Sequence, residues 1–300
     1  MKRNQLGSSD LSVSEIGLGC MSIGTDEDQA IRLLHEALDQ GINLLDTADL
    51  YDEGRNEELV GKAIKGRRSE VILASKVGNR RIPGQEGWTW DASKAYILSA
   101  VKDSLRRLGT DYLDLYQLHG GTLDDPIEET IEAFEQLKRE GVIRHYGISS
   151  IRPNVIREYV SRSKIVSVMS QYSILDRRPE EEVLPLLESH GISVIARGPV
   201  ASGVLTESGG RKLSKGYLGY SEEELREFRR GVQSAVDRPL AETALRYPLA
   251  SPAVACVLAG ASTSEQLHAN IEAISRAPLS AEELSAIRQA VPANVYAQHR

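Results

Sequence analysis

The sequence Asp-Thr-Ala-Asp-Leu-Tyr at residues 46–51 directly follows the apolar run Ile-Asn-Leu-Leu at residues 42–45. A short apolar run that begins after a glycine, here Gly41, is typical of a buried strand. The stretch therefore places an acid, Asp46, and a tyrosine, Tyr51, at the tip of a strand. In a parallel α/β barrel, catalytic residues lie at the carboxyl tips of the strands.

Two later strand-like runs also end in side chains that can carry chemistry. Residues 71–76, Val-Ile-Leu-Ala-Ser-Lys, end in Lys76, and residues 113–119, Leu-Asp-Leu-Tyr-Gln-Leu-His, end in His119. Because the carboxyl ends of parallel strands meet at one edge, we expect these two residues to lie beside Asp46 and Tyr51. Taken singly, each residue also has an ordinary structural interpretation, as a turn acid, a rim aromatic, a strand-end charge or a loop histidine.

Strand-like and helix-like segments alternate along the whole chain, with strands that begin near residues 16, 43, 71, 113, 143, 165, 193 and 254. Repeated strand–helix units predict a parallel sheet with right-handed crossovers, and eight strands close a (β/α)8 TIM barrel. An open doubly wound sheet is the alternative. No Gly-x-Gly-x-x-Gly follows the first strand, which counts against its dinucleotide-binding version. We therefore predict an α/β fold with one barrel domain over residues 1–300.

Helices are predicted over residues 26–40, 56–65 with Asn56 as a cap, 94–108, 126–140, 153–161, 179–190 and 264–274. A turn signal at residues 7–10 predicts an N-terminal hairpin over residues 3–15 that closes the bottom of the barrel, and residues 280–289 predict an extra C-terminal helix. Two segments, 78–90 and 206–237, interrupt the alternation. We expect them to be long loops that gate the site, with a solvated excursion as the alternative.

Composition restricts the partners that this protein could have. The net charge is -7, with both signs interspersed, which argues against nucleic acid because phosphate binding needs a concentrated basic face. No apolar run approaches the roughly 20 residues that cross a bilayer, and no signal core follows Met1, so we expect a cytoplasmic protein that does not bind membranes. Two cysteines outside any Cys-x-x-Cys motif and six scattered histidines predict no metal site.

The order and spacing of the motifs resemble the aldo-keto reductase family. Residues 46–58, with Gly61 after them, resemble its first signature, and residues 108–119 resemble its second. Residues 147–150, Gly-Ile-Ser-Ser, resemble its nicotinamide-binding strand end, and the resemblance runs from about residue 5 to about residue 273. It implies an NAD(P)H-dependent oxidoreductase that reduces an aldehyde or ketone.

The resemblance implies a catalytic role for each of the four strand-end residues. Tyr51 would be the general acid that protonates the forming alkoxide, since a tyrosine with a pKa of about 10 keeps its proton at neutral pH. Lys76 would stabilise the phenolate and lower that pKa, and Asp46 would hold Lys76 in place. His119 would donate a hydrogen bond to the substrate oxygen.

The resemblance also implies which residues contact the cofactor. Ser149, Ser150 and Gln171 match positions that hold the nicotinamide carboxamide, although asparagine is usual where Ser150 stands. Arg197 stands where many members stack a tyrosine on the nicotinamide, and a planar guanidinium can also stack. The positions around the nicotinamide and substrate are Gly19, Cys20, Met21 and Asp46. Those around the pyrophosphate are Gly198, Pro199, Val200 and Ser202, and those at the adenosine phosphate are Gly260, Ser262, Thr263, Gln266 and Asn270.

The adenosine-phosphate segment departs from the pattern in its charge. Some members of the family carry lysine or arginine where Gly260, Ser262 or Gln266 stands, whereas this chain has no positive charge at these positions. We therefore expect NADP(H) as the cofactor with a modest preference over NAD(H), unless Arg211, Lys212 or Lys215 folds over from the long loop. NAD(H) is the alternative cofactor.

Two rival functions stay open at this stage. A cofactor-binding redox sensor or regulatory subunit could use the same barrel, and a metal-dependent barrel hydrolase is a third reading that lacks clustered ligands in the sequence. The identity of the small-molecule carbonyl substrate and the oligomeric state, monomer or small homo-oligomer, are left open.

Overall fold

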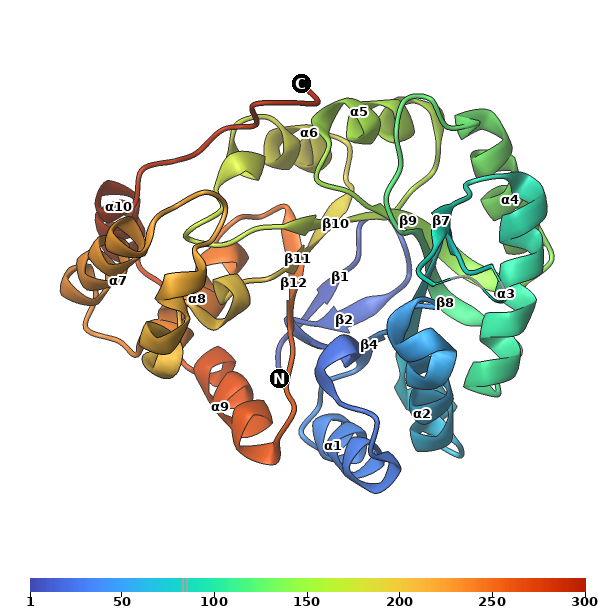
Figure 1. Ribbon diagram of the computed structural model, residues 1–300, viewed down its shortest axis with the longest axis horizontal. Helices are drawn as coiled ribbons and strands as arrows, with labels where there is room; N and C mark the ends of the chain where they lie inside the picture. The colour runs from blue at the N-terminus through green and yellow to red at the C-terminus, as the bar shows by residue number, and fades with distance from the viewer. Residues whose placement is uncertain (83, 85) are drawn as a thin grey trace.

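The computed structural model describes residues 1–82, 84 and 86–300, so Pro83 and Gln85 of the predicted 78–90 loop lie outside it. Its centre is a closed barrel of eight parallel strands, which confirms the predicted (β/α)8 fold (Figure 1). The strands around the barrel are β10 (Ser167–Gln171), β11 (Ser193–Arg197), β12 (Val254–Ala259), β3 (Ile16–Gly19), β4 (Leu44–Asp46), β5 (Ile72–Val77), β8 (Leu113–Leu118) and β9 (Ile143–Ser149).

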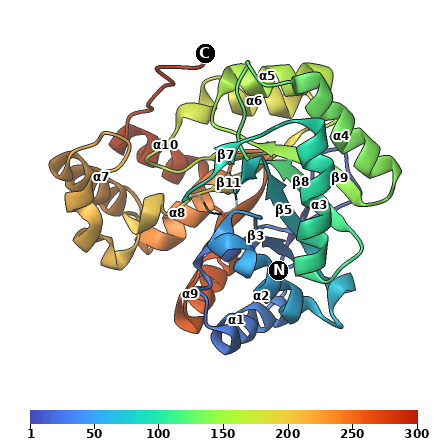
Figure 2. The ribbon, with the colours of Figure 1, turned by 45° about the vertical axis from the view of Figure 1, so that its right-hand side comes forward.

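Helices surround the barrel, and each buries one apolar face against it (Figures 1 and 2). They are α1 (Glu27–Asp39), α2 (Arg55–Ile64), α3 (Lys94–Leu108), α4 (Ile127–Arg139), α5 (Pro153–Arg162), α6 (Val183–Ser189), α8 (Leu240–Leu249) and α9 (Ser264–Ser275). Two further helices, α7 (Glu222–Ala235) and α10 (Ala281–Ala290), pack against each other and project beyond this ring, as Figure 2 shows.

The N-terminal hairpin closes one end of the barrel, as predicted. Strands β1 (Arg3–Gln5) and β2 (Ser12–Ser14) are antiparallel, and the turn between them carries Leu6 and Leu11 into the barrel interior. The interior cluster consists of Leu6, Leu11, Val13, Leu44, Ile72, Ala74, Leu115, Val166, Met169, Ile195, Ala255, Cys256 and Leu258. Each fully buried aliphatic side chain contributes about 1.5–3 kcal/mol, so the hairpin is an integral part of the core.

Two details of the predicted helices are wrong. Asn56 does not cap α2, because the helix begins at Arg55 after Gly54, whose φ of 88° only glycine adopts easily. The buried Asn56 instead accepts a hydrogen bond from Thr47 Oγ1 and donates one to the carbonyl of Cys20. The helix predicted over residues 179–190 is shorter, since a 3-10 turn at Arg178–Glu180 precedes α6.

The two predicted long loops contain more regular structure than expected. Residues 78–90 hold a short antiparallel pair, β6 (Asn79–Arg80) and β7 (Thr89–Trp90). Residues 206–237 hold a 3-10 helix (Glu207–Lys215) and α7, whose start is fixed by a capping box between Ser221 and Glu224. Helix α7 was not predicted because its sequence is strongly polar, and α8 was not predicted either. Whether either segment gates the site stays a prediction.

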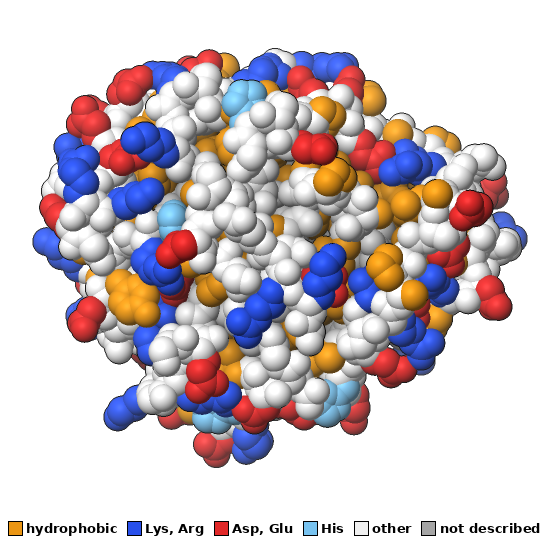
Figure 3. Space-filling view, turned by 180° about the vertical axis from the view of Figure 1, so that it is seen from behind, with side chains coloured by type: hydrophobic (Ala, Val, Ile, Leu, Met, Phe, Trp, Pro, Cys, Tyr) orange, Lys and Arg blue, Asp and Glu red, His pale blue; other side chains and the backbone are white. Residues whose placement is uncertain are grey.

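The outer surface carries charges of both signs. On the face shown in Figure 3, basic and acidic side chains are interspersed, with hydrophobic side chains scattered among them. Within the part of the chain that the structure describes, none of the helices is long and apolar enough to cross a membrane.

Candidate active site

Neighbouring strands bring three of the predicted residues to one end of the barrel. Asp46 ends β4 and pairs in register with Ala74 of β5, and Lys76 follows two residues later on the same face of β5. Tyr51 begins a 3-10 turn beyond β4, and this turn is folded back by two residues with left-handed backbone, Asp52 (φ 47°) and Glu53 (φ 59°). Such conformations are uncommon outside glycine and are concentrated at functional sites.

The ammonium group of Lys76 is the hub of this cluster. Its Nζ donates hydrogen bonds to Asp46 Oδ2 (2.6 Å), to the carbonyl oxygen of Thr47 (2.8 Å) and to the Tyr51 hydroxyl (3.2 Å). Lys76 is only 1% exposed, and an ammonium has three protons to donate, so all of them are used. Gln117 Nε2 donates to the other oxygen of Asp46 at 3.3 Å. The amine is therefore fixed against the tyrosine hydroxyl.

Burial and charge act in opposite directions on these groups. Burial lowers the pKa of Lys76, but Asp46 and Tyr51 beside it more than offset this and hold the pKa above its ordinary value. Burial raises the pKa of Tyr51, and Lys76 opposes the rise without cancelling it. The prediction that Lys76 lowers the Tyr51 pKa is correct for that interaction alone. The net direction is upward, because a phenolate loses its hydration in this pocket.

His119 lies at the end of β8, and its ring meets Tyr51 edge to face with centroids 5.9 Å apart and planes at 81°. Burial, together with the charges of Lys76 and Arg197, lowers the pKa of His119 to about 3. The imidazole is therefore neutral at ordinary pH. Its Nδ1 is buried and has no hydrogen-bond partner among the described residues.

The strand ends next to this cluster carry the residues predicted to face the nicotinamide. Ser149 and Ser150 are buried at the end of β9, and Ser150 Oγ accepts a hydrogen bond from the backbone N–H of Arg152. Arg197 Nη1 donates to Gln171 Oε1 at 3.0 Å, and Gln171 Nε2 donates to the hydroxyl of Tyr217 at 3.1 Å. The Gln171 amide is thus held from both sides.

The loop predicted to wrap the pyrophosphate has an unusual backbone. Gly198, Ala201, Ser202 and Gly203 all have positive φ, at 67°, 48°, 56° and 86°. Three of these residues, Ala201, Ser202 and Gly203, are consecutive, so the backbone turns tightly at this point. Lys212 from the 206–237 segment donates to the Ser202 carbonyl at 2.9 Å, so a cation lies on the same loop. Pro199 is buried and Val200 is half-buried within it.

The groups predicted for the adenosine phosphate contact one another at the start of α9. Thr263 is the N-cap and accepts from the backbone N–H of Gln266, whose Oε1 accepts from the N–H and hydroxyl of Ser262. Asn270 Nδ2 donates to the Gly260 carbonyl at 3.3 Å. A helix N-terminus with hydroxyl groups can bind phosphate. The segment is exposed, and Lys212 lies on the pyrophosphate loop rather than here.

The remaining predicted residues come from the end of β3. Gly19 of β3 is the register partner of Asp46 on the neighbouring strand β4, Cys20 is fully buried, and Met21 is 67% exposed. Burial raises the pKa of the Cys20 thiol well above its usual range, so it is an inert filler. Met21 is the member of this group that a substrate could reach.

The arrangement fits the nicotinamide cofactor that the sequence implies. Asp46, Tyr51, Lys76 and His119 form a tetrad at this end of the barrel. Two buried polar atoms here, Gln117 Oε1 beside Asp46 and Nδ1 of His119 itself, have no partner among the described residues, which is unusual away from binding sites. The tight turn at residues 198–203, where the sequence predicts the pyrophosphate, has the ammonium group of Lys212 on its Ser202 carbonyl. In the described part of the chain, no group of three or more His, Cys, Asp or Glu residues is arranged to hold a metal ion.

Sequence reasoning missed three residues that shape this site. Gln117 could have been found, because it lies two residues before His119 and strand alternation points it the same way. Asn56, which ties Thr47 to Cys20, was assigned to a cap instead. Tyr217 comes from the 206–237 segment, and no local signal in the sequence places it against Gln171.

Comparisons with known proteins agree with this geometry. Residues 15–292 match the model of the Aldo/keto reductase family. An uncharacterized oxidoreductase, YqkF, of Bacillus subtilis (strain 168) is 58% identical, with 100% of each chain covered. The holo form of aldo-keto reductase AKR11C1 from Bacillus halodurans is 62% identical and superposes with a TM-score of 0.95, covering 100% of this chain and 99% of the other. The NADH-specific methylglyoxal reductase of Escherichia coli (strain K12) is 31% identical, covering 91% of this chain and 94% of its own.

Proposed function

We propose that this chain, which belongs to the aldo/keto reductase family, reduces an aldehyde or ketone with Tyr51 as the proton donor. Membership of the family makes it an NAD(P)H-dependent oxidoreductase. The cofactor, when bound, supplies the hydride. The observation that most supports the role of Tyr51 is its hydrogen bond from the buried ammonium group of Lys76.

Tyr51 and Lys76 form a proton donor that is ready before substrate arrives. Because the pKa of Tyr51 is above its ordinary value, the hydroxyl holds its proton until a carbonyl oxygen gains negative charge. The fixed charge of Lys76 then stabilises the phenolate that remains, and it needs no rearrangement because Asp46 and the Thr47 carbonyl already hold it.

His119 orients the substrate oxygen as a neutral hydrogen-bond donor. Because its pKa is about 3, the ring is uncharged at neutral pH and has one N–H to donate in a hydrogen bond. We assign the ring proton to Nε2, because Nδ1 is buried and has no hydrogen-bond partner among the described residues. A neutral donor aimed at the forming oxyanion lowers the barrier without competing with Tyr51 for the proton transfer.

The cofactor would be held by side chains and backbone on neighbouring strand ends. Ser149, Ser150, Gln171 and Arg197 would contact the nicotinamide end, the loop 198–202 the pyrophosphate, and the start of α9 the adenosine end. The partner is a small-molecule carbonyl compound. The cytoplasmic location, the lack of a nucleic-acid partner and the oligomeric state stay predictions from the sequence.

The test is turnover of a panel of aldehydes and ketones, measured as loss of NADPH or NADH absorbance, in the parent and in Tyr51→Phe. The variant keeps the ring but has no proton to give, so kcat should fall by at least about 100-fold, the scale of a lost general acid. Cofactor affinity, measured by fluorescence titration, should stay the same.

Tyr112→Phe is the matched control, because Tyr112 lies at the opposite end of the barrel and should change nothing. Retention of most activity in Tyr51→Phe would exclude Tyr51 as the acid. A parent that binds NADPH but turns over no carbonyl in the panel would favour the redox-sensor alternative.

A further inference from the structure

His119 has to point at the substrate oxygen, yet none of the residues that the structure describes forms a hydrogen bond with its ring. Nδ1 lacks a partner among the described residues, and the recorded ring contact is the edge-to-face packing with Tyr51. The backbone of His119 is held, since its N–H donates to the Val77 carbonyl at 2.8 Å. The direction of the side chain therefore depends on how rigidly the next residues, Gly120 and Gly121, are held.

The indole of Trp90 packs against the backbone of Gly78 and Gly120, which follow the strand ends that carry Lys76 and His119. A β-carbon built on Gly78 would lie 2.5 Å from Trp90 Cζ3, and one built on Gly120 would lie 3.3 Å from the same ring. Gly78 follows β5, and Gly120 directly follows His119. Both glycines have positive φ, at 127° and 151°. The ring thus fills the space that side chains at these two positions would need.

A hydrogen bond fixes the indole in this place. Trp90 Nε1 donates to Asp125 Oδ1 at 2.8 Å, and Asp125 Oδ2 accepts from the backbone N–H of Thr122 at 2.8 Å. The carboxylate therefore joins the indole of β7 to the loop that begins at His119. From the other side, Arg152 donates to the Gly121 carbonyl at 2.6 Å. The loop after His119 is held between these two contacts.

We propose that Trp90, anchored by Asp125, is a positioning residue for His119, an inference that rests on the proposed function only for its effect on turnover. The indole holds Gly120 against the end of β5, so the imidazole keeps its direction although no described residue forms a hydrogen bond with its Nδ1. Trp90 does not need to touch the substrate to act in this way.

The first test measures the position of His119 without cofactor or substrate. Protein labelled with carbon-13 at histidine Cε1 gives one NMR signal for each of the six histidines, and His119→Gln identifies the signal of His119. Trp90→Phe shortens the ring and removes its N–H, so it should shift or broaden that signal and leave the other five in place. Trp88→Phe is the matched control, because Trp88 lies on the same segment but is 52% exposed.

The second test uses turnover. Trp90→Phe should lower kcat by about 10-fold, on the scale of one hydrogen bond, while the KM for the cofactor stays within about twofold. In a His119→Gln background the same change should have no further effect, since the residue being positioned is gone. Asp125→Ala keeps the indole but removes the acceptor of Trp90 Nε1, together with that of the Thr122 N–H. It should give a smaller loss in the same direction, and it serves as the test if Trp90→Phe does not fold.

An unchanged His119 signal in both Trp90→Phe and Asp125→Ala would overturn the proposal, as would additive losses of kcat in the double variant. A parent that reduces no carbonyl would contradict the proposed function alone, because the NMR measurement does not depend on turnover. A shifted His119 signal in that inactive parent's Trp90→Phe variant would still support the positioning role.

Discussion

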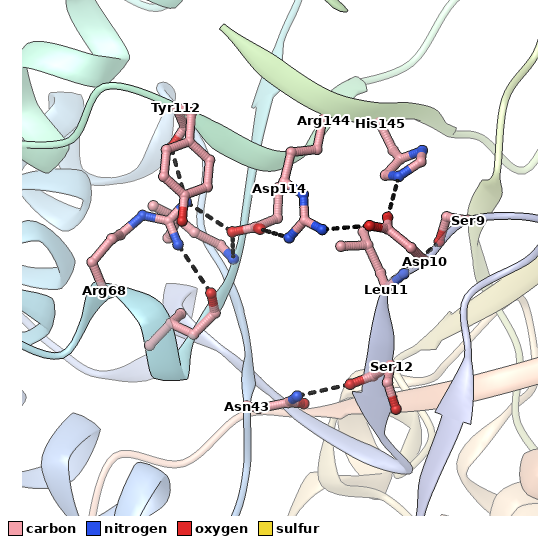
Figure 4. Close-up of polar contacts among 12 residues, drawn as sticks. Ser9, Asp10, Leu11, Ser12, Asn43, Arg68, Tyr112, Asp114, Arg144 and His145 are labelled. Atoms are coloured by element: carbon pink, nitrogen blue, oxygen red, sulfur yellow. Dashed lines mark hydrogen bonds and ion pairs between the residues drawn. The ribbon is translucent and has the colours of Figure 1, made fainter. Parts of the chain in front are cut away.

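Each end of this barrel carries a network of charged side chains, and the two networks differ in how much of them water can reach. At the end closed by the hairpin, Asp114 accepts hydrogen bonds from Arg68 (2.8 Å) and Arg144 (2.9 Å), and Arg144 and His145 reach Asp10 in the hairpin turn (Figure 4). Arg144 and Asp10 are 42% and 67% exposed in their side chains. Water therefore hydrates the outer charges of this network, although the Asp114 side chain at its centre is only 2% exposed.

At the other end, the charge pair of Lys76 and Asp46 is almost completely removed from water, with side chains 1% and 5% exposed. Burying such a pair costs several kcal/mol per ion, and replacing it with apolar side chains is often neutral or stabilising. Stability therefore does not explain the upper pair. The charged network at the hairpin end fastens the hairpin to the barrel. The Lys76–Asp46 pair instead holds a cation against Tyr51, which is the arrangement that the proposed reaction needs.

The largest effect is expected from removing Asp114, the centre of the charged network at the hairpin end. Asp114→Ala leaves Arg68 and Arg144 without their shared carboxylate and the Leu73 N–H without its acceptor. We expect the free energy of unfolding, measured by urea denaturation, to fall by about 2–4 kcal/mol, with kcat within about twofold of the parent.

The exposed Asp111, three residues earlier, provides the control, and Asp111→Ala should change neither quantity. If Asp114→Ala instead lost activity and kept its stability, the lower network would belong to the functional machinery and the comparison would fail.

A smaller effect is expected at the neutral adenosine end of the cofactor site. Hydroxyl groups, an amide and a helix N-terminus bind a phosphate less tightly than an arginine does. We expect KM for NADPH to be lower than that for NADH by about 10- to 100-fold, which is about 1.4–2.7 kcal/mol. Since Lys212 contacts the pyrophosphate loop, Lys212→Ala should weaken both cofactors alike and leave their ratio unchanged.

The measurement is KM for both cofactors in the parent, in Lys212→Ala and in the Arg211/Lys212/Lys215 triple alanine variant. Collapse of the preference in the triple variant would mean that the segment supplies a cation to the 2′-phosphate after all. A parent that prefers NADH outright would identify Gly260 and Ser262 as marks of an NAD enzyme.

The sequence was sufficient for the barrel and for bringing the tetrad together, because both depend on local rules. Strand alternation and the common carboxyl edge of parallel strands place Asp46, Lys76 and His119 without any tertiary information. Contacts made by the inserted segments, such as Tyr217 on Gln171 or Trp90 on Gly120, could not be predicted, since no local pattern sets where such segments fold back.

The direction of the pKa shifts could not be predicted either. The sequence shows that a lysine can lie beside Tyr51, but it does not show how deeply the hydroxyl is buried, and burial decides the direction of the Tyr51 pKa shift. Asn56 failed in a similar way. Its local signal as a helix cap was real, but the contacts with Thr47 and Cys20 set its place in the folded chain.

The smallest expected effect is that of pH on turnover through His119. A histidine with an ordinary pKa of 6.5 would charge as the pH falls from 8 to 5, but burial lowers the pKa of His119 to about 3. Because the folded pKa lies below the unfolded one, acid favours the unfolded chain: stability is lost as the pH falls from about 6.5 toward 3, while the ring in the folded enzyme stays neutral. We therefore expect kcat/KM to vary by less than about twofold between pH 5 and 8 on account of this residue. The check is the pH–rate profile of the parent against that of His119→Gln.

Asp49, whose pKa burial raises to about 7, titrates between pH 5 and 8 as well, so Asp49→Asn is the control that separates its contribution. A change of kcat/KM near pH 6.5 that persists in Asp49→Asn and disappears in His119→Gln would show that His119 carries charge during turnover. His119 could then also donate a proton, and the division between a neutral hydrogen-bond donor, His119, and a proton donor, Tyr51, would be lost.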